Sequence, residues 1–456
     1  MSAAPIVLEA EHRLPLPVQV VWDHLANTDD LDREIGLPTV TYGPVTVSAD
    51  GVHRQAATRF WGVLAARWRE YPFEWVRGER YSVLRAFEAG FLDTFSGGVQ
   101  LRAEGTDTAV RFFAEMVPRG ALGGLVARIM GRKGIRDSIR YCEAFVASRR
   151  TGTDLAAPAP SRSTPADPRG IEALERGLGE AGVPEALIRR LTRHLTSAPD
   201  REVLRMQPLA LADGWGADRD ETVRLFLRAE RLGALFHTWE VLCPNCRVSK
   251  AAVRSAEGVP SRFHCEVCAV DYDSDLSHNV ELRFSVHPGL RPAREERYCL
   301  GGPANFPHIW AQQYLLPTTE RVVSMHLAAE AFRARSLRHN QSCPLEPDPA
   351  GPAEVILTYR QDGWYQMRQR FRPGPVTIRL QNETDAVVVL VVEQVRWDPH
   401  AITAAEVMGN PLFQPLPSAE DPGRGQAEGG APPADGVPPR AGQGPRPAAG
   451  VGPAGQ

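Results

Sequence analysis

The alternation of apolar and polar positions divides the first 150 residues into a short helix, a run of strands and a long closing helix. Val18, Val21, Trp22 and Leu25 recur at the spacing of one helical face. Strands are predicted at 7–13, 39–48, 54–64, 75–87, 91–103 and 109–117. A helix is predicted over 119–148, with an apolar stripe formed by Leu122, Leu125, Val126, Ile129, Ile139, Cys142 and Phe145. We therefore expect residues 1–150 to form one α+β domain.

The pattern changes after residue 150. Residues 151–168 have no periodicity and are rich in Pro, Ser, Thr and Ala, which predicts a linker. Residues 169–240 predict helices at about 171–180, 184–195 and 218–232, followed by a strand at 237–241, an order that suits a winged-helix-like segment. Residues 286–400 contain period-two strands, the clearest at 354–359, 364–371, 376–381 and 387–397, and we expect an antiparallel β-sandwich there.

Composition is that of a globular protein with a biased end. The chain is 43% hydrophobic and 23% charged, which excludes collagen and wholesale disorder. The last 38 residues, 419–456, hold 10 Gly and 8 Pro, so we expect a disordered tail over 401–456. The net charge of −3 gives no global bias toward nucleic acid or an anionic membrane.

The sequence predicts neither a membrane span nor secretion. The longest unbroken apolar run, at 386–392, is seven residues, against about 20 for a bilayer-spanning helix. The N-terminus lacks a basic start followed by an apolar core, so no secretory signal is expected. Seven cysteines in such a chain favour a cytoplasmic protein with reduced thiols or metal ligands over a disulfide framework.

Four cysteines form the clearest chemical motif. Cys243 and Cys246 are two residues apart, as are Cys265 and Cys268, and 18 residues separate the pairs. Two facing C-x2-C turns can present four thiolates to one tetrahedral zinc ion with no position left for water. We therefore predict a zinc ribbon over 241–285 with a structural zinc. Reduced thiols without metal are the main alternative.

The surroundings of this motif give weaker signals. Residues 247–262 are expected to form a hairpin with its turn at 258–260. His264 and His278 flank the cysteines, but four thiolates would already fill the site. The remaining cysteines, Cys142, Cys299 and Cys343, have no activating histidine and acid nearby in sequence, and Cys142 is expected to be buried.

Aromatic residues concentrate on the strands of the first domain. Trp61, Trp68 and Trp75 are candidates to line an apolar ligand cavity, with Phe60 and Phe73 nearby. Packing in a plain core is the alternative.

Two arginine clusters are weaker candidates for partner sites. Arg189, Arg190 and Arg193 lie on a short predicted helix, but residues 170–240 hold 10 Arg and 12 acidic residues, so nucleic-acid binding is not favoured. The second cluster lies on the closing helix of the first domain and is expected to be a solvated face; its members are Arg128, Arg132, Lys133, Arg136 and Arg140.

Two resemblances cover most of the chain. The order of elements in residues 1–150 resembles the START-like, or SRPBCC, helix-grip fold. The second block resembles an uncharacterised bacterial domain family that typically lies between such a domain and a class III adenylate/guanylate cyclase domain. The resemblance is carried by 207–213 (QPLALAD), 223–227 (VRLFL), 239–246 (WEVLCPNC), 263–268 and 303–399.

The resemblance implies the regulatory half of a cyclase-like protein in cyclic nucleotide signalling, and the four cysteines occupy that family's presumed zinc positions. No cyclase catalytic domain follows residue 415, so we expect a non-catalytic sensory or regulatory protein that binds an apolar small molecule. A protein partner or homo-oligomer would receive its signal. The alternatives are a nucleic-acid-binding regulator, an enzyme in the N-terminal cavity, or a truncated cyclase-like protein that has lost activity.

Overall fold

The computed structural model describes residues 4–48, 51–151, 164–265, 268, 270–337 and 341–413. Most of the predicted linker, at 152–163, lies outside the described residues, as does the predicted tail from 414 onward. Among the described helices, none combines the length and apolar character needed to cross a bilayer.

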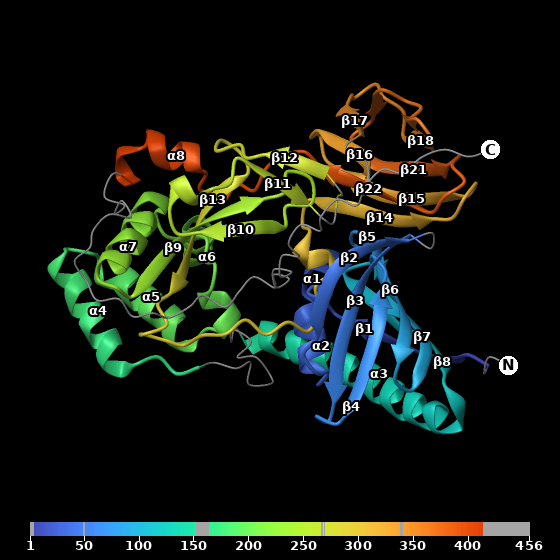
Figure 1. Ribbon diagram of the computed structural model, residues 1–456, viewed down its shortest axis with the longest axis horizontal. Helices are drawn as coiled ribbons and strands as arrows, with labels where there is room; N and C mark the ends of the chain where they lie inside the picture. The colour runs from blue at the N-terminus through green and yellow to red at the C-terminus, as the bar shows by residue number, and fades with distance from the viewer. Residues whose placement is uncertain are drawn as a thin grey trace, which may run out of the picture. The chain divides into compact units, whose positions relative to one another are not determined.

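The N-terminal domain has a curved antiparallel sheet with helices on one side (Figure 1). Its strands are β1 (Ile6–Leu14), β2 (Thr41–Ser48), β3 (Gly51–Phe60), β4 (Leu64–Glu70), β5 (Glu74–Val76), β6 (Arg80–Ala89), β7 (Leu92–Glu104) and β8 (Asp107–Pro118). Its helices are α1 (Val18–Leu25), α2 (Thr28–Glu34) and α3 (Gly120–Thr151). The strands pair in the order β1-β8-β7-β6-β4-β3-β2, and α3 packs along β1 and β8. This arrangement confirms the predicted helix-grip fold.

The first three turns of α3 pack on the sheet through small residues, not through the predicted apolar stripe, whereas Ile139 and Cys142 of that stripe pack in the domain core. A Cβ atom at Gly123 would clash with the main-chain oxygen of Phe91 in the β6–β7 turn, and one at Gly131 would lie 2.7 Å from side chains of β1 and β8. This close approach turns the larger residues outward: Leu122, Leu125 and Ile129 are 56–75% exposed. The predicted stripe is therefore wrong over the first three turns of α3.

The next segment is helical and ends in a small sheet. Its helices are α4 (Pro168–Glu180), α5 (Glu185–Ser197), the 3-10 turn η1 (Asp200–Val203), α6 (Pro208–Trp215) and α7 (Arg219–Arg231). The sheet has the order β10-β9-β13, with β9 (Leu235–Leu242), β10 (Ser249–Val253) and β13 (Val280–Val286). The predicted helices correspond to α4, α5 and α7, and the predicted strand to β9, whereas α6 was not expected. The winged-helix likeness of this segment stays a prediction.

Two expectations next to this sheet are wrong. The expected 247–262 hairpin does not form, because β10 pairs with β9, whereas β11 (Arg262–Cys265) pairs with β12 (Val270–Asp273); the short η2 (Ala256–Gly258) lies between β10 and β11. Residues 401–413, assigned to the disordered tail, form α8 (Ala404–Gly409) and η4 (Pro411–Phe413). They bury Ile402 and Phe413 in the core of the helical segment.

The last block is a sandwich of two sheets. One has the order β14-β22-β16-β17-β20, from β14 (Ile309–Leu315), β16 (Phe332–Ser336), β17 (Ser342–Pro347), β20 (Gln369–Phe371) and β22 (Val388–Gln394). The other has the order β15-β21-β18-β19, from β15 (Glu320–Leu327), β18 (Glu354–Arg360), β19 (Gly363–Trp364) and β21 (Gly374–Asn382). Residues from both sheets share one apolar core, as a sandwich requires. The pairs β17–β20 and β18–β21 are parallel, so the sandwich is not wholly antiparallel as predicted.

Strand β5 joins the N-terminal sheet to the sandwich. It pairs with β6 on one side and with β14 on the other, which makes one continuous 13-stranded sheet. Trp75 lies at this junction, where its indole Nε1 donates to the carbonyl of Ile309, 234 positions away in sequence (3.2 Å). The ring of Phe306, just after η3 (Pro303–Asn305), stacks on Trp75 with centroids 6.2 Å apart. The N-terminal domain therefore shares both a sheet and a core with the sandwich.

This junction predicts different effects for two tryptophans of the first domain. Trp75 is 1% exposed, so Trp75→Ala should lower the free energy of unfolding by about 3–5 kcal/mol. Trp61 is 71% exposed, and Trp61→Ala should change it by about 0.5 kcal/mol or less. Urea unfolding of both variants measures this, and equal losses would contradict the placement of Trp75 in the shared core.

Candidate metal centre

The four predicted cysteines meet in one buried cluster. Their Sγ atoms all lie within 4.8 Å of one another, and each residue is at most 2% exposed. Cys243 Sγ is 3.8 Å from Cys268 Sγ, and Cys246 Sγ is 3.6 Å from Cys265 Sγ. Four sulfurs at about 2.3 Å from a tetrahedral metal would be separated by about 3.8 Å. These separations fit a four-coordinate metal and are too long for disulfide bonds.

The first cysteine pair is presented by a tight turn. This turn follows β9, where the amide of Arg247 donates to the carbonyl of Cys243 (2.8 Å). Arg247 adopts a left-handed conformation with φ 56°, and this reverses the chain into β10. In the second pair, Cys265 is the last residue of β11, and the amide of Cys268 donates to Cys265 Sγ (3.4 Å). An amide aimed at sulfur stabilises the ionised thiolate that a metal ligand requires.

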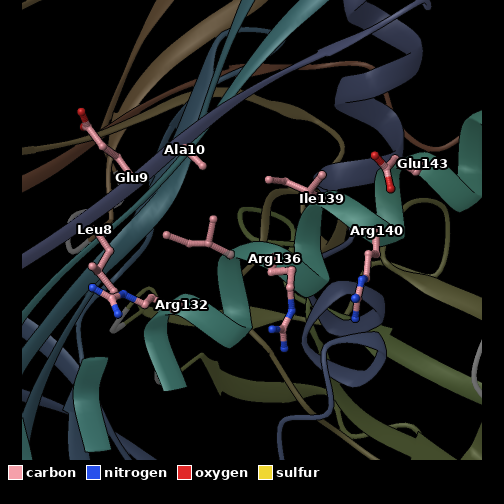
Figure 2. A pocket seen from close by; sticks show the side chains of 9 residues that line it. Leu8, Glu9, Ala10, Arg132, Arg136, Ile139, Arg140 and Glu143 are labelled. Atoms are coloured by element: carbon pink, nitrogen blue, oxygen red, sulfur yellow. The ribbon is translucent and has the colours of Figure 1, made fainter. Parts of the chain in front are cut away.

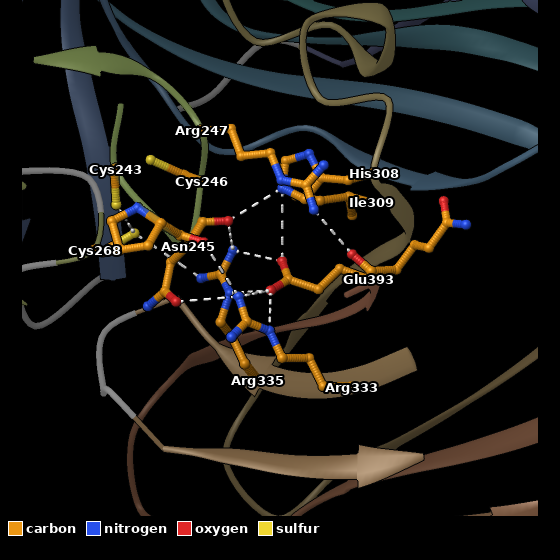
Figure 3. A network of polar contacts seen from close by, with 12 residues as sticks. Cys243, Asn245, Cys246, Arg247, Cys268, His308, Ile309, Arg333, Arg335 and Glu393 are labelled. Atoms are coloured by element: carbon orange, nitrogen blue, oxygen red, sulfur yellow. Dashed lines mark hydrogen bonds and ion pairs between the residues drawn. The ribbon is translucent and has the colours of Figure 1, made fainter. Parts of the chain in front are cut away.

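A buried ion-pair network packs against the cysteine cluster (Figure 3). Glu393 on β22 accepts from Arg335 Nε (2.9 Å) and Nη2 (2.8 Å), and from Arg333 Nε (2.6 Å). Arg335 also directs Nη1 toward Cys268 Sγ at 4.0 Å. Glu393 is fully buried and Arg335 is 1% exposed. The cluster of four sulfurs therefore has a buried cation beside it, and that cation is held by a buried carboxylate.

The charge of Glu393 is maintained against its burial. Burial alone raises the pKa of this carboxyl, but Arg335 and Arg333 outweigh that effect and bring its pKa down to about 2. Glu393 is therefore ionised at neutral pH and supplies the negative charge that Arg335 needs inside the protein.

The same network fastens the first cysteine turn to the sandwich. Asn245, between the two cysteines, accepts on its main-chain carbonyl from His308 Nε2 (3.1 Å) and Arg335 Nη2 (3.4 Å). Its side-chain oxygen accepts from Arg333 (3.1 Å). Arg247 donates to carbonyls at the end of β22, including that of Arg396 (2.7 Å). Strands of the sandwich thus hold the turn that presents two of the four sulfurs.

The two flanking histidines do not join the cluster. His264 lies against Asp271 (2.9 Å) and His278 against Asp275 (2.9 Å), and all four side chains are more than half exposed. Of the other cysteines, Cys142 is buried as predicted. Burial raises the pKa of Cys343 to about 11, which disfavours a reactive thiolate.

The three candidate ligand-lining tryptophans lie in three different environments. Trp61 is on the surface at the β3–β4 turn. Trp68 is buried with Ala56 and Ala66 in a small core cluster. Trp75 is in the core that the domain shares with the sandwich. The structure does not bring them together, and their ligand role stays a prediction.

A charged cluster inside the N-terminal domain was not predicted. Arg85 Nε on β6 donates to Glu70 Oε2 on β4 (2.9 Å), and Asp32 on α2 lies 4.0 Å from the same guanidinium. Burial raises the pKa of Asp32 to about 7, although Arg85 opposes the shift. The Oη atom of the buried Tyr81 has no hydrogen-bond partner among the described residues. The interior of this domain is therefore partly polar.

A cavity of about 480 Å³ lies between β1 and α3 (Figure 2). Its apolar lining comes from Leu8 and Ala10 on the strand and from Ile135 and Ile139 on the helix. Charged side chains complete the lining: Glu9, Arg132, Arg136, Arg140 and Glu143. Part of the predicted arginine cluster therefore borders an open groove.

The sequence motif identified the four clustered cysteines but missed the groups that pack against them. Arg333, Arg335, His308 and Glu393 come from three strands or strand ends that follow the cysteines by many residues. One signal was present: Glu393 directly follows the long apolar run at 386–392, and a lone charge next to a buried strand calls for a partner. Nothing in the sequence indicated which cation would provide it.

The comparisons with known families match part of the second block. Residues 172–296 match a family of unknown function (DUF5939). This segment contains α5 to α7, the small sheet and all four cysteines. No curated protein matches the chain.

Solved structures resemble about a third of the chain. The Zhui aromatase/cyclase from Streptomyces sp. R1128 has 13% identity and a TM-score of 0.26, over 33% of this chain and 100% of the other. A point mutant of norcoclaurine synthase from Thalictrum flavum has 12% identity and a TM-score of 0.25, over 33% of this chain and 99% of the other. TM-scores this low establish neither a shared ligand nor a shared reaction. The helix-grip assignment rests on the element order and strand pairing described above.

Removing the Glu393 charge should destabilise the protein strongly. Glu393→Gln leaves Arg335 buried without its counter-charge, and we expect the free energy of unfolding to fall by about 3–5 kcal/mol. Glu383→Gln is the matched control, because Glu383 pairs with Arg360 on the surface (2.7 Å) and should cost no more than about 1 kcal/mol. Urea unfolding measures the free energy of unfolding of both variants. Similar losses would show that the buried Arg335–Glu393 pair contributes no more to stability than the exposed Arg360–Glu383 pair.

Because His308 is buried, we expect the protein to lose stability in mild acid. Burial lowers the pKa of His308 to about 3, whereas the unfolded chain takes up the proton near pH 6.5. Protons therefore favour the unfolded state as the pH falls below 6.5, and this group costs about 1.4 kcal/mol between pH 7.5 and 5.5. His308→Gln keeps an amide donor for Asn245. Between pH 7.5 and 5.5, the free energy of unfolding of this variant should fall by about 1.4 kcal/mol less than that of the wild type. An identical pH dependence in both proteins would contradict a neutral, buried His308.

Proposed function

We propose that this chain is a zinc-organised sensory or regulatory protein with no catalytic function of its own. The observation that carries the proposal is the set of four buried Sγ atoms within 4.8 Å, supported by Arg335 beside Cys268. Four cysteine sulfurs are the donor set that Zn²⁺ takes in structural sites. A site closed by four sulfurs leaves no position for a substrate or an activated water, so the metal would act on structure and not on a reaction.

In this proposal the zinc ion ties together three parts of the chain. Cys243 and Cys246 follow β9 of the helical segment, while Cys265 and Cys268 belong to the β11–β12 hairpin. The third part is the sandwich, which contacts the first turn through Arg333, Arg335 and His308. Without the metal, the four sulfurs would lose the interaction that holds the two cysteine pairs together.

The helix-grip domain would supply the input signal. We propose that it binds an apolar small molecule, as its fold suggests, and that binding changes the strands that contact it. Because β5 pairs with both β6 and β14, a shift in the first domain has a physical route into the sandwich sheet. That sheet carries Glu393 on β22, next to the cysteine cluster.

The output is proposed from the resemblance to the regulatory half of adenylate/guanylate cyclases. We propose that the second block passes the state of the first domain to a protein partner or to a second copy of the chain. The match to a family of unknown function over 172–296 includes the cysteine cluster, which supports a shared structural role for it within that block.

Zinc content and chelation test this proposal. We expect one zinc ion per purified chain, measured by elemental analysis, and a lower melting temperature in a strong chelator. Cys243→Ser should lose the metal and the chelator effect. Cys343→Ser is the matched control, since Cys343 is buried outside the cluster, and it should keep both. A wild-type protein without zinc whose melting ignores the chelator would refute the proposal.

A further inference from the structure

The outer face of α3 changes from apolar to cationic along its length. Leu122, Leu125, Ile129, Arg132, Arg136 and Arg140 are separated by three or four residues and lie on one face of the helix. All six are exposed, and the first three are 75%, 56% and 60% exposed. A helix that packs on a sheet normally directs such leucines inward. Here the glycine-rich inner face leaves them in solvent.

A second exposed apolar feature lies at the same end of the domain as the start of this helix. Trp61 and Gly62, in the turn between β3 and β4, have φ of 51° and 73°. Positive φ at both central positions makes a tight hairpin turn, and it is an uncommon conformation for tryptophan. The turn exposes Trp61 (71%) and Val63 (83%).

The β6–β7 turn connects these two features. The ring of Phe60, next to Trp61, lies 5.7 Å from the ring of Phe91. The main-chain oxygen of Phe91 lies against Gly123 in the first turn of α3. The exposed side chains of the turn and of the helix start therefore belong to one end of the domain. We call this surface the apolar end; it consists of Trp61, Val63, Leu122, Leu125 and Ile129.

A cationic band continues from the apolar end along the helix; it consists of Arg128, Arg132, Lys133, Arg136 and Arg140. The sequence of α3 contains seven basic and two acidic residues, although the whole chain has a net charge of −3. Lys133, Arg136 and Arg140 all lie near the single carboxylate of Asp137, at 2.7, 3.4 and 3.4 Å. Within the described part of the chain, Arg128 and Arg132 have no acidic partner. The band therefore keeps a strong local positive charge.

We propose that this face of α3 and the β3–β4 turn dock the protein on an anionic phospholipid bilayer. The apolar end enters the boundary between head groups and acyl chains, where tryptophan is favoured, while the arginines contact lipid phosphates. The groove between β1 and α3 borders the same arginines and offers an apolar surface beside them. The bilayer contact is peripheral and is independent of the zinc centre.

Charge favours a bilayer over a second copy of this chain as the occupant. A two-fold symmetric contact with parallel α3 helices would bring two cationic bands together, and one with antiparallel helices centred on α3 would place each cationic band against the partner's apolar end, so neither contact supplies the arginines with negative charge. An anionic bilayer instead supplies a continuous negative surface that complements the band, with an apolar interior for the exposed leucines.

Vesicle sedimentation of the full chain tests the proposal. We expect binding to vesicles of phosphatidylcholine with 30% phosphatidylglycerol in low salt, weakening as salt is added, and little binding to pure phosphatidylcholine. Arg132→Gln with Arg136→Gln should weaken binding roughly thirtyfold. Arg189→Gln with Arg193→Gln is the matched control, because these arginines are also four residues apart and exposed on α5, and binding should not change.

A second variant separates docking from charge attraction alone. Trp61→Ser with Leu125→Ser removes apolar side chains that are already exposed, so urea unfolding should be unchanged while vesicle binding falls at least tenfold. The proposal is overturned if wild type fails to sediment with anionic vesicles, or if it binds neutral vesicles equally well. It is also overturned if the apolar variant converts a dimer to a monomer without changing vesicle binding, since the surface would then serve a second copy.

Discussion

Four thiol groups buried within 4.8 Å of one another are the constraint on which the second block depends. Sulfurs this close cannot all ionise unless a cation lies among them, and unbound thiols would not need a charged arginine beside them. Arg335 is itself buried and must be neutralised, which requires Glu393. The sulfurs therefore explain the buried Arg335, and Arg335 explains the buried Glu393. Glu393 lies on β22, a strand in the middle of the sandwich sheet.

The position of that strand links the cysteine cluster to the rest of the chain. Strand β22 pairs with β14 and β16, and β14 also pairs with β5 of the helix-grip domain. One sheet therefore extends from the domain that we propose as the sensor to the carboxylate that supports the cysteine cluster. The buried aromatic contacts of Trp75 stabilise the point where the two parts meet.

Local patterns predicted the parts of this architecture that depend on neighbouring residues. The helices over 168–180, 185–197 and 219–231 follow from apolar spacing and capping, and the C-x2-C spacing by itself identified the four cysteines as one set. The outward turn of Leu122 and Leu125 could not be predicted from periodicity, because it depends on how closely Gly123 approaches the β6–β7 turn. The Arg335–Glu393 pair likewise joins strands distant in sequence, and pairing of that kind leaves no local signal.

X-ray absorption at the zinc edge of the purified protein identifies the atoms that bind the metal, and so distinguishes four cysteine sulfurs from any other set of ligands. We expect a first shell of four sulfur atoms at about 2.3 Å, with no nitrogen or oxygen scatterer. A shell with nitrogen or oxygen at about 2.0–2.1 Å would show that the cysteines do not close the site, and it would contradict a structural metal centre supported by Arg335 and Glu393.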